Sequence, residues 1–269
     1  MSIVAVLSRD RAVRSLPATV ETVGAVASTR VSGRLLRLVR ERPVTTVLVD
    51  GAVFAEEWEP ELLVRELGRR FPSVGTVFLD RGATSMNTLL GLGRLIRDGQ
   101  ARLSVIRMEE VRHGLARSLA RASEASTRSA VLRAVGNRLA GRERGVLGAA
   151  MDAALLGWGA EDLAAHAGWT RPHLSERLRA AQLPSTGALL LWARTLHAAR
   201  WLPEPGRTAE SVSRQLGYAN GATFRRALRN VLGVTPTALV AAGGFDLALR
   251  RFLDECGLGD SVRDDRSVA

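Results

Sequence analysis

The sequence predicts an α/β region with a parallel sheet, followed by an all-α region. In roughly the first 110 residues, short runs rich in valine, isoleucine and threonine alternate with helical patterns. Beyond them, apolar residues recur only at three- and four-residue steps, which is typical of helices. The chain has 269 residues, 46% of them hydrophobic, which is enough for packed cores without disulfides or metal.

Five apolar runs are the expected strands: residues 3–7, 24–28, 45–49, 74–79 and 102–106. Helical patterns fill the intervals at residues 10–16, 32–41, 60–71 and 84–96. Strands that alternate with helices form parallel sheets with helices on both faces. We therefore predict a flavodoxin-like (βα)5 domain over residues 1–110.

This region carries no signature of a nucleotide-binding or catalytic site. Ligands of such folds bind at the carboxyl ends of strands, yet Ser8-Arg9-Asp10-Arg11 follow the first strand without a glycine-rich loop. Gly91 and Gly93 fall inside an expected helix, and no G-x-S-x-G elbow occurs. The sequence has no lysine, which excludes Schiff-base and P-loop lysines, and its four histidines stand apart from other metal ligands. We expect no enzyme activity, no cofactor and no metal site.

The five-unit pattern resembles the receiver domain of two-component response regulators. The resemblance is one of topology over about 110 residues, with weak matches of individual residues. It implies a phosphoacceptor aspartate at the end of the third strand, where Asp50 stands. A residue that caps a loop is the alternative reading of Asp50.

Most of the receiver's phosphate chemistry is missing from the expected positions. Receivers hold a magnesium ion with two acids after the first strand, where this chain has Ser8 and Arg9, with Asp10 one step later. The hydroxyl residue after the fourth strand is replaced by Asp80 or Arg81, and Arg107 lies near the place of the lysine of the fifth. Because Arg9 would repel magnesium, we expect a receiver-like domain that no longer takes phosphate. Phosphorylation of Asp50 remains the alternative.

Residues 111–158 predict connector helices. An amphipathic pattern runs from Glu109 to about Leu139 and is broken by a polar stretch at residues 123–129. Residues 145–157 form a further apolar helix. Self-association and ordinary core packing both fit this helix.

A helix, a glycine turn and a capped helix follow at residues 161–181. Gly168 stands where a helix ends, Thr170 is suited to cap the next helix, and Pro172 falls in its first turn. The order of these signals predicts a helix-turn-helix unit.

The same order returns at residues 208–232. Gly217 and Tyr218 form the turn, and Asn220 caps a helix whose Phe224 and Leu228 share a face. The apolar helix expected at residues 185–202 would span about 25 Å between the units. That length suits two recognition helices in successive major grooves, roughly 34 Å apart.

This second unit resembles the AraC/XylS family of transcription regulators. The family pattern is L-G-F, then F-x-R, then G-x-T-P. The chain has Leu216-Gly217-Tyr218, then Phe224-Arg225-Arg226, then Gly233-Val234-Thr235-Pro236. Leu228 replaces the usual aromatic residue, and Leu239-Val240 replace an aromatic residue and an arginine. The resemblance covers about residues 155–240 and implies a DNA-binding domain over residues 159–245, followed by a C-terminal helix and tail at 246–269.

In that family, the residues that read bases lie early on the second helix of each unit. In the first unit, the implied DNA-binding residues are Arg171, Pro172, Ser175, Glu176 and Arg179. In the second unit, they are Asn220, Ala222, Thr223, Arg225, Arg226 and Arg229. For any single arginine, a solvated helix face is the alternative.

The charge agrees with double-stranded DNA as the partner. The chain has a formal net charge of +11, and residues 165–245 contain ten arginines and three acidic residues. A protein-interaction module with vestigial DNA binding is the alternative. The single Cys256 and the lack of any run of ~20 apolar residues predict a cytoplasmic protein without a membrane segment. The resemblance to the AraC/XylS family implies a bacterial protein. Homodimer formation and the signal stay open.

Overall fold

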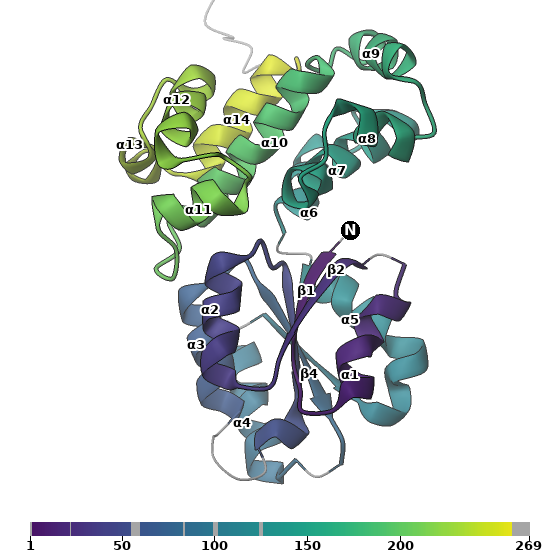
Figure 1. The fold of residues 1–269 in the computed structure, drawn as a ribbon, viewed down its shortest axis with the longest axis vertical. Helices are drawn as coiled ribbons and strands as arrows, with labels where there is room; N and C mark the ends of the chain where they lie inside the picture. The colour runs from purple at the N-terminus through teal and green to yellow at the C-terminus, as the bar shows by residue number, and fades with distance from the viewer. Residues whose placement is uncertain are drawn as a thin grey trace, which may run out of the picture.

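The computed structural model describes residues 2–21, 23–54, 60–82, 84–98, 102–123 and 126–259. An α/β region and a helical region lie one above the other along the long axis (Figure 1). Within the described residues, no helix has the length and apolar character needed to cross a membrane. The expected polar tail after Cys256 lies largely outside the described residues.

The α/β region contains a five-stranded parallel sheet in the order β2-β1-β3-β4-β5, which confirms the predicted flavodoxin-like class. The strands are β1 (Ser2–Leu7), β2 (Val23–Thr29), β3 (Thr46–Asp50), β4 (Gly75–Asp80) and β5 (Leu103–Arg107). Every residue of β3 and β4 is buried. Because both faces of these central strands are covered, they are continuous apolar runs rather than alternating ones.

Helices cover both faces of the sheet. They are α1 (Arg11–Ser15), α2 (Ser32–Glu41), α3 (Pro60–Arg70), α4 (Met86–Arg97) and α5 (Val111–Ala122), with short 3-10 segments at Leu16–Thr19, Gly51–Phe54 and Met108–Glu110. Leu35 of α2, Leu67 of α3 and Leu92 of α4 share one core. Val13 of α1 and Leu119 of α5 share the core on the opposite face. Figure 1 shows the two layers, with α2 and α3 on one side of the strands and α1 and α5 on the other.

Packing places α5 with the sheet, although the sequence division ended the α/β domain at residue 110. Helix α5 packs on β4 and β5, and Leu115 lies in the core with Leu48 and Val77. A side chain at Gly75 would collide with the carbonyl oxygen of Ala122, at 2.0 Å from the Cβ position. The amphipathic stripe of α5 therefore completes the fifth βα unit.

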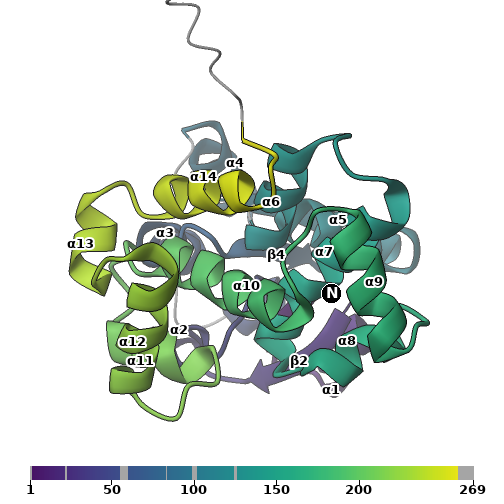
Figure 2. The ribbon, with the colours of Figure 1, turned by 90° about the horizontal axis from the view of Figure 1, so that it is seen from above.

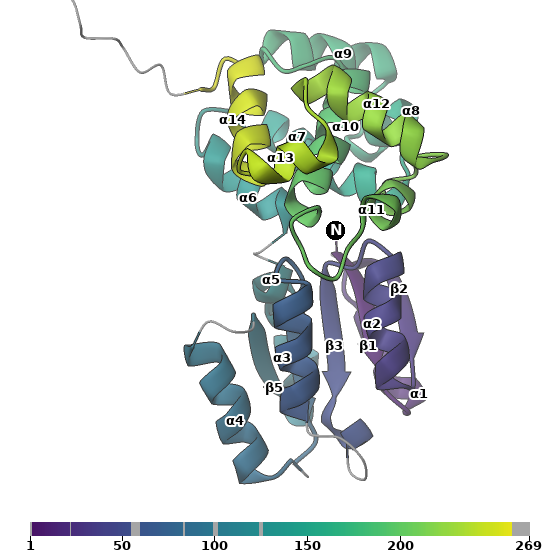
Figure 3. The ribbon, with the colours of Figure 1, turned by 90° about the vertical axis from the view of Figure 1, so that its left-hand side faces the viewer.

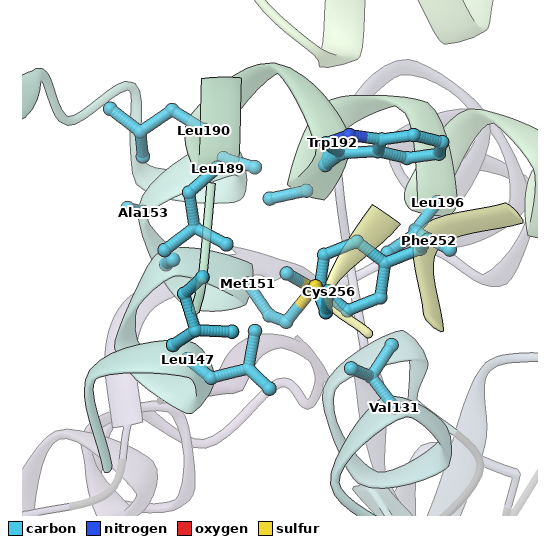
Figure 4. Close-up of a cluster of buried hydrophobic side chains, with 14 of the residues drawn as sticks. Val131, Leu147, Met151, Ala153, Leu189, Leu190, Trp192, Leu196, Phe252 and Cys256 are labelled. Carbon is cyan, nitrogen blue, oxygen red and sulfur yellow. The ribbon is translucent and has the colours of Figure 1, made fainter. Parts of the chain in front are cut away.

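The helical region is built around one long helix. Its elements are α6 (Thr127–Val135), α7 (Gly141–Leu156), α8 (Ala160–His166), α9 (Arg171–Ala180), α10 (Thr186–Trp201), α11 (Ala209–Gln215), α12 (Gly221–Leu232), α13 (Pro236–Ala241) and α14 (Phe245–Glu255). Helix α10 lies between α7 and α14, where Met151, Leu196 and Phe252 meet (Figure 4). Residues from Val146 to Leu155 of α7 are all buried, which favours core packing over self-association for this helix.

The two regions join at the end of the α/β region where the strands begin. The backbone N–H of Gly206 donates to the carbonyl oxygen of Arg70 at 3.1 Å, and that of Ser73 donates to Glu204 Oε1 at 2.8 Å. Ser73 lies just before β4, so the strands run away from the helical region. The carboxyl ends of the strands consequently lie at the far end of the molecule (Figure 1).

Candidate nucleic-acid interface

The first helix-turn-helix unit consists of α8, a glycine turn and α9. Gly168 has a φ of 70°, a left-handed conformation that favours glycine. The Thr170 hydroxyl accepts a hydrogen bond from the backbone N–H of His173, and Pro172 lies in the first turn of α9. Leu174 and Leu178 are buried, so the opposite face of α9 is left for a partner.

The structure places the predicted residues of this unit on the free face of α9. Arg171, Pro172, Glu176 and Arg179 are exposed, and Ser175 is half-buried. The Ser175 hydroxyl donates to the carbonyl oxygen of Arg171 at 3.1 Å, so it has a partner within its own helix.

Two further residues of α9, Arg177 and His173, differ in whether they are free to contact DNA. Arg177 pairs with the buried Glu143 of α7 and lies over the Trp169 ring at 5.8 Å. It therefore fastens α9 to the helical core. His173, which is not among the predicted DNA-binding residues, is half-exposed in the first turn of α9, 4.0 Å from Glu176. Its position early on the second helix is the signal that could have added it to the predicted set.

The second unit, α11 and α12, repeats this construction. The turn glycine, Gly217, has a φ of 73°. Thr208 and Ser211 form a reciprocal capping box, in which the serine hydroxyl replaces the usual glutamate carboxylate. Asn220 caps α12, because its Oδ1 accepts from the Thr223 N–H at 2.9 Å and from the Thr223 hydroxyl at 3.1 Å. These local bonds fix where the recognition helix begins.

Helix α12 buries Phe224, Leu228 and Leu232 and exposes its other side. The predicted residues Asn220, Ala222, Thr223, Arg225, Arg226 and Arg229 are all exposed. Gly221, at the start of the helix, is instead buried, and a Cβ there would lie 2.9 Å from Glu210 Oε2. The atom that such a Cβ would meet is the end of a flexible side chain of α11, which can move aside.

The two second helices lie at opposite ends of α10, as Figures 1 and 2 both show. In each unit, the second helix lies farther from the sheet than the first: α9 beyond α8, and α12 beyond α11 (Figure 1). Five arginines of these helices have exposed guanidinium groups without a hydrogen bond or ion pair to any described residue. They are Arg171, Arg179, Arg225, Arg226 and Arg229. An arginine fork without a protein partner is suited to phosphate or guanine.

A second polar site lies at the far end of the α/β region, around the predicted phosphoacceptor. Asp50 is buried, accepts a hydrogen bond from the Ser8 hydroxyl at 2.6 Å, and lies 3.1 Å from Arg81 Nε. Arg81 Nη2 also donates to Asp10 at 2.6 Å. One guanidinium thus pairs with both carboxylates.

This arrangement corrects the expected role of Arg9. Arg9 is exposed, and it is Arg81, from the end of β4, that faces the carboxylates. The hydrogen bond from Arg81 lowers the pKa of Asp10, and the same bond raises the pKa of Arg81. No group of three or more histidine, cysteine or acidic residues suited to a metal ion occurs among the described residues.

Comparison with known proteins identifies the helical region. Residues 163–242 match a family model described as a helix-turn-helix domain, of the AraC type. The match runs from α8 to α13 and so contains both units. It supports a DNA-binding regulator and covers less than a third of the chain. The comparisons with curated proteins and with solved structures gave no match.

Proposed function

We propose that this chain is a sequence-specific transcription regulator that binds double-stranded DNA through α9 and α12. One observation carries the proposal: two capped helices at the ends of a rigid spacer present five exposed, unpaired arginines. The helix-turn-helix match over residues 163–242 supports the same class of partner.

The exposed residues divide by chemistry into two kinds of contact. Arg179, Arg225 and Arg229 are suited to phosphate contacts, which position a protein on DNA without reading its sequence. Arg171 and Arg226 are suited to forked bonds with guanine, and Glu176 is suited to accept a bond from cytosine N4. Ala222 and Thr223 present methyl groups, which favour contact with thymine.

Selection of bound sequences from random DNA, followed by the Arg226→Ala variant, tests this proposal. Loss of a base contact should weaken binding to the selected site by about 1–3 kcal/mol and relax the preference at one base position. Arg94→Ala, an exposed arginine on α4, is the control and should bind like the wild type. If Arg226→Ala weakens binding to selected DNA and to random DNA equally, Arg226 contacts only phosphate. Selection that enriches no sequence would refute sequence-specific binding.

We further propose that the α/β region is a receiver-like domain that no longer takes phosphate. The Arg81 guanidinium pairs with both Asp10 and Asp50, where a magnesium ion would need free oxygen ligands. The positive charge supplied by Arg81 takes the place of that ion. The domain would then respond to a signal other than phosphorylation, or serve self-association as a homodimer.

Incubation with acetyl phosphate and magnesium, followed by intact mass measurement, tests this second proposal. We expect no covalent adduct on the wild-type chain. An adduct located at Asp50 would instead establish a phosphorylation-dependent response regulator.

A DNA-binding titration over a series of salt concentrations tests the remaining alternative. A chain that binds no DNA at any salt concentration would favour a protein-interaction module.

A further inference from the structure

The α/β region is fastened directly to the second helix-turn-helix unit. Arg207, just before α11, donates through Nη1 to Gln215 Oε1 at 2.5 Å and to the carbonyl oxygen of Val39 at 3.4 Å. Gln215 in turn donates to the carbonyl oxygen of Arg40. These two carbonyl groups belong to the last turn of α2, where helix carbonyls have no partner within the helix.

This junction places the C-terminal end of α2 beside the reading element. Gln215 is the last residue of α11, and only the turn at residues 216–220 separates it from α12. Helices α2 and α11 are in contact, as Figure 3 also shows. The buried side chains of Arg207 and Glu204 leave little freedom for the two parts to separate.

Along α2, a row of arginines faces solvent on the side away from the sheet. Leu35 and Val39 are the buried residues of the helix. The exposed arginines of α2 and its ends are Arg30, Arg34, Arg37, Arg40 and Arg42. The only acidic residue between positions 30 and 42 is Glu41, which lies 3.9 Å from Arg40. Among the described residues, no carboxylate pairs with the other four arginines.

The exposed faces of α3 and α4 differ from that of α2 in their side chains. On α4, the exposed side chains include Met86, Leu90 and Ile96. On α3, Arg69 and Arg70 both pair with Glu66. Helix α5 also exposes arginines, at Arg112, Arg117 and Arg121, but it packs on the opposite face of the sheet. The contact of α2 with α11 is therefore what connects its arginine row with the charge of the helical region.

We propose that the arginine row of α2 binds the phosphate backbone of DNA that flanks the site of α12. This inference rests on DNA binding by the helical region. Because the recognition helices lie beyond α11, flanking DNA must bend toward α2 to reach the row. Bending DNA costs free energy, which additional phosphate contacts can offset.

The test compares two double variants that remove the same charge. Arg37→Gln/Arg40→Gln removes two exposed arginines three residues apart on α2. Arg94→Gln/Arg97→Gln, the control, removes two exposed arginines with the same spacing on α4. The two variants are also matched in ion pairs, because Arg40 lies 3.9 Å from Glu41 and Arg97 lies 3.6 Å from Asp98. Each full-length protein is titrated, over a series of salt concentrations, with a duplex of the selected site alone and with one extended on the α12 side.

On the extended duplex, the α2 variant should reduce the slope of log affinity against log salt by about 1–2, since each phosphate contact contributes roughly 0.9. Its DNA bend, measured from gel mobility, should decrease. On the short duplex, it should bind like the wild type, and the α4 variant should match the wild type on both. A wild-type slope and bend for the α2 variant on the extended duplex would overturn this inference alone. Wild-type protein that binds neither duplex would overturn the proposed function, and this inference with it.

Discussion

Replacement of Arg207 by methionine should separate the two regions of the molecule at lower denaturant concentration than in the wild type. The Arg207 side chain is fully buried, its Nε lies 2.6 Å from Glu204 Oε2, and its guanidinium lies over the Trp201 ring at 4.5 Å. Burial lowers the pKa of Arg207, and the charge of Glu204 opposes this effect. Methionine keeps much of the apolar stem but removes every hydrogen-bond donor.

The expected loss of unfolding free energy follows from the buried polar groups that lose a hydrogen-bond or ion-pair partner. The carboxylate of Glu204 stays buried and keeps the hydrogen bond from the backbone N–H of Ser73, and the carbonyl oxygen of Val39 loses a donor. Removal of one partner of a buried ion pair costs about 3–5 kcal/mol, because the remaining charge has no compensation. That is a large share of a typical unfolding free energy of ~5–15 kcal/mol.

Urea unfolding followed by tryptophan fluorescence measures this loss, since Trp201 lies at the junction. Arg214→Met, an exposed arginine of α11, is the control and should stay within about 0.5 kcal/mol of the wild type. Glu204→Gln/Arg207→Met should lose less than the sum of its single variants, because no charge is then left buried. A loss below about 1 kcal/mol for Arg207→Met would refute this account of the junction.

Three further predictions concern single side chains. Complete burial lowers the pKa of His197 from 6.5 to about 4, while its Nε2 lies 2.9 Å from the carbonyl oxygen of Met151. Because the unfolded chain then binds a proton that the folded chain does not, the free energy of unfolding should decrease by about 3 kcal/mol as the pH falls from 6.5 to 4; urea unfolding at several pH values should show a flatter profile for His197→Gln. Burial, aided by Glu255, raises the pKa of Cys256 to about 12, so a thiol reagent at pH 8 should react only as fast as the protein unfolds, and rapid labelling of the native chain would contradict this. Asn220→Ala should destabilise α12 by about 1 kcal/mol in thermal unfolding, whereas Asn220→Ser should keep the cap; equal losses would show that the cap contributes nothing.

Features that depend on neighbouring residues were predictable from the sequence. The turn glycines Gly168 and Gly217 and the caps Thr170 and Asn220 act within three or four residues, so their pattern locates both helix-turn-helix units. The parallel sheet was predictable for a similar reason, because continuous apolar runs report burial on both faces. The exposure of Arg226 followed from the helical spacing of Phe224 and Leu228.

Features that depend on distant residues were not predictable in detail. Arg9 was expected beside the phosphoacceptor position, because it follows the first strand directly. The structure instead brings Arg81, from the end of a different strand, to both Asp10 and Asp50. Strand order and side-chain direction decide which arginine reaches the carboxylates, and neither has a local signal.

The sequence by itself therefore determined the two fold classes, the two helix-turn-helix units and the residues on their free faces. Only the tertiary structure decided that α5 completes the sheet, that Arg81 fills the polar site, and that α2 lies against α11. The hydrogen bond between Gln215 and Arg40 joins residues 175 positions apart. Such a contact forms only where packing of whole elements brings two surfaces together, whereas caps and turns form wherever a few neighbouring residues have suitable side chains.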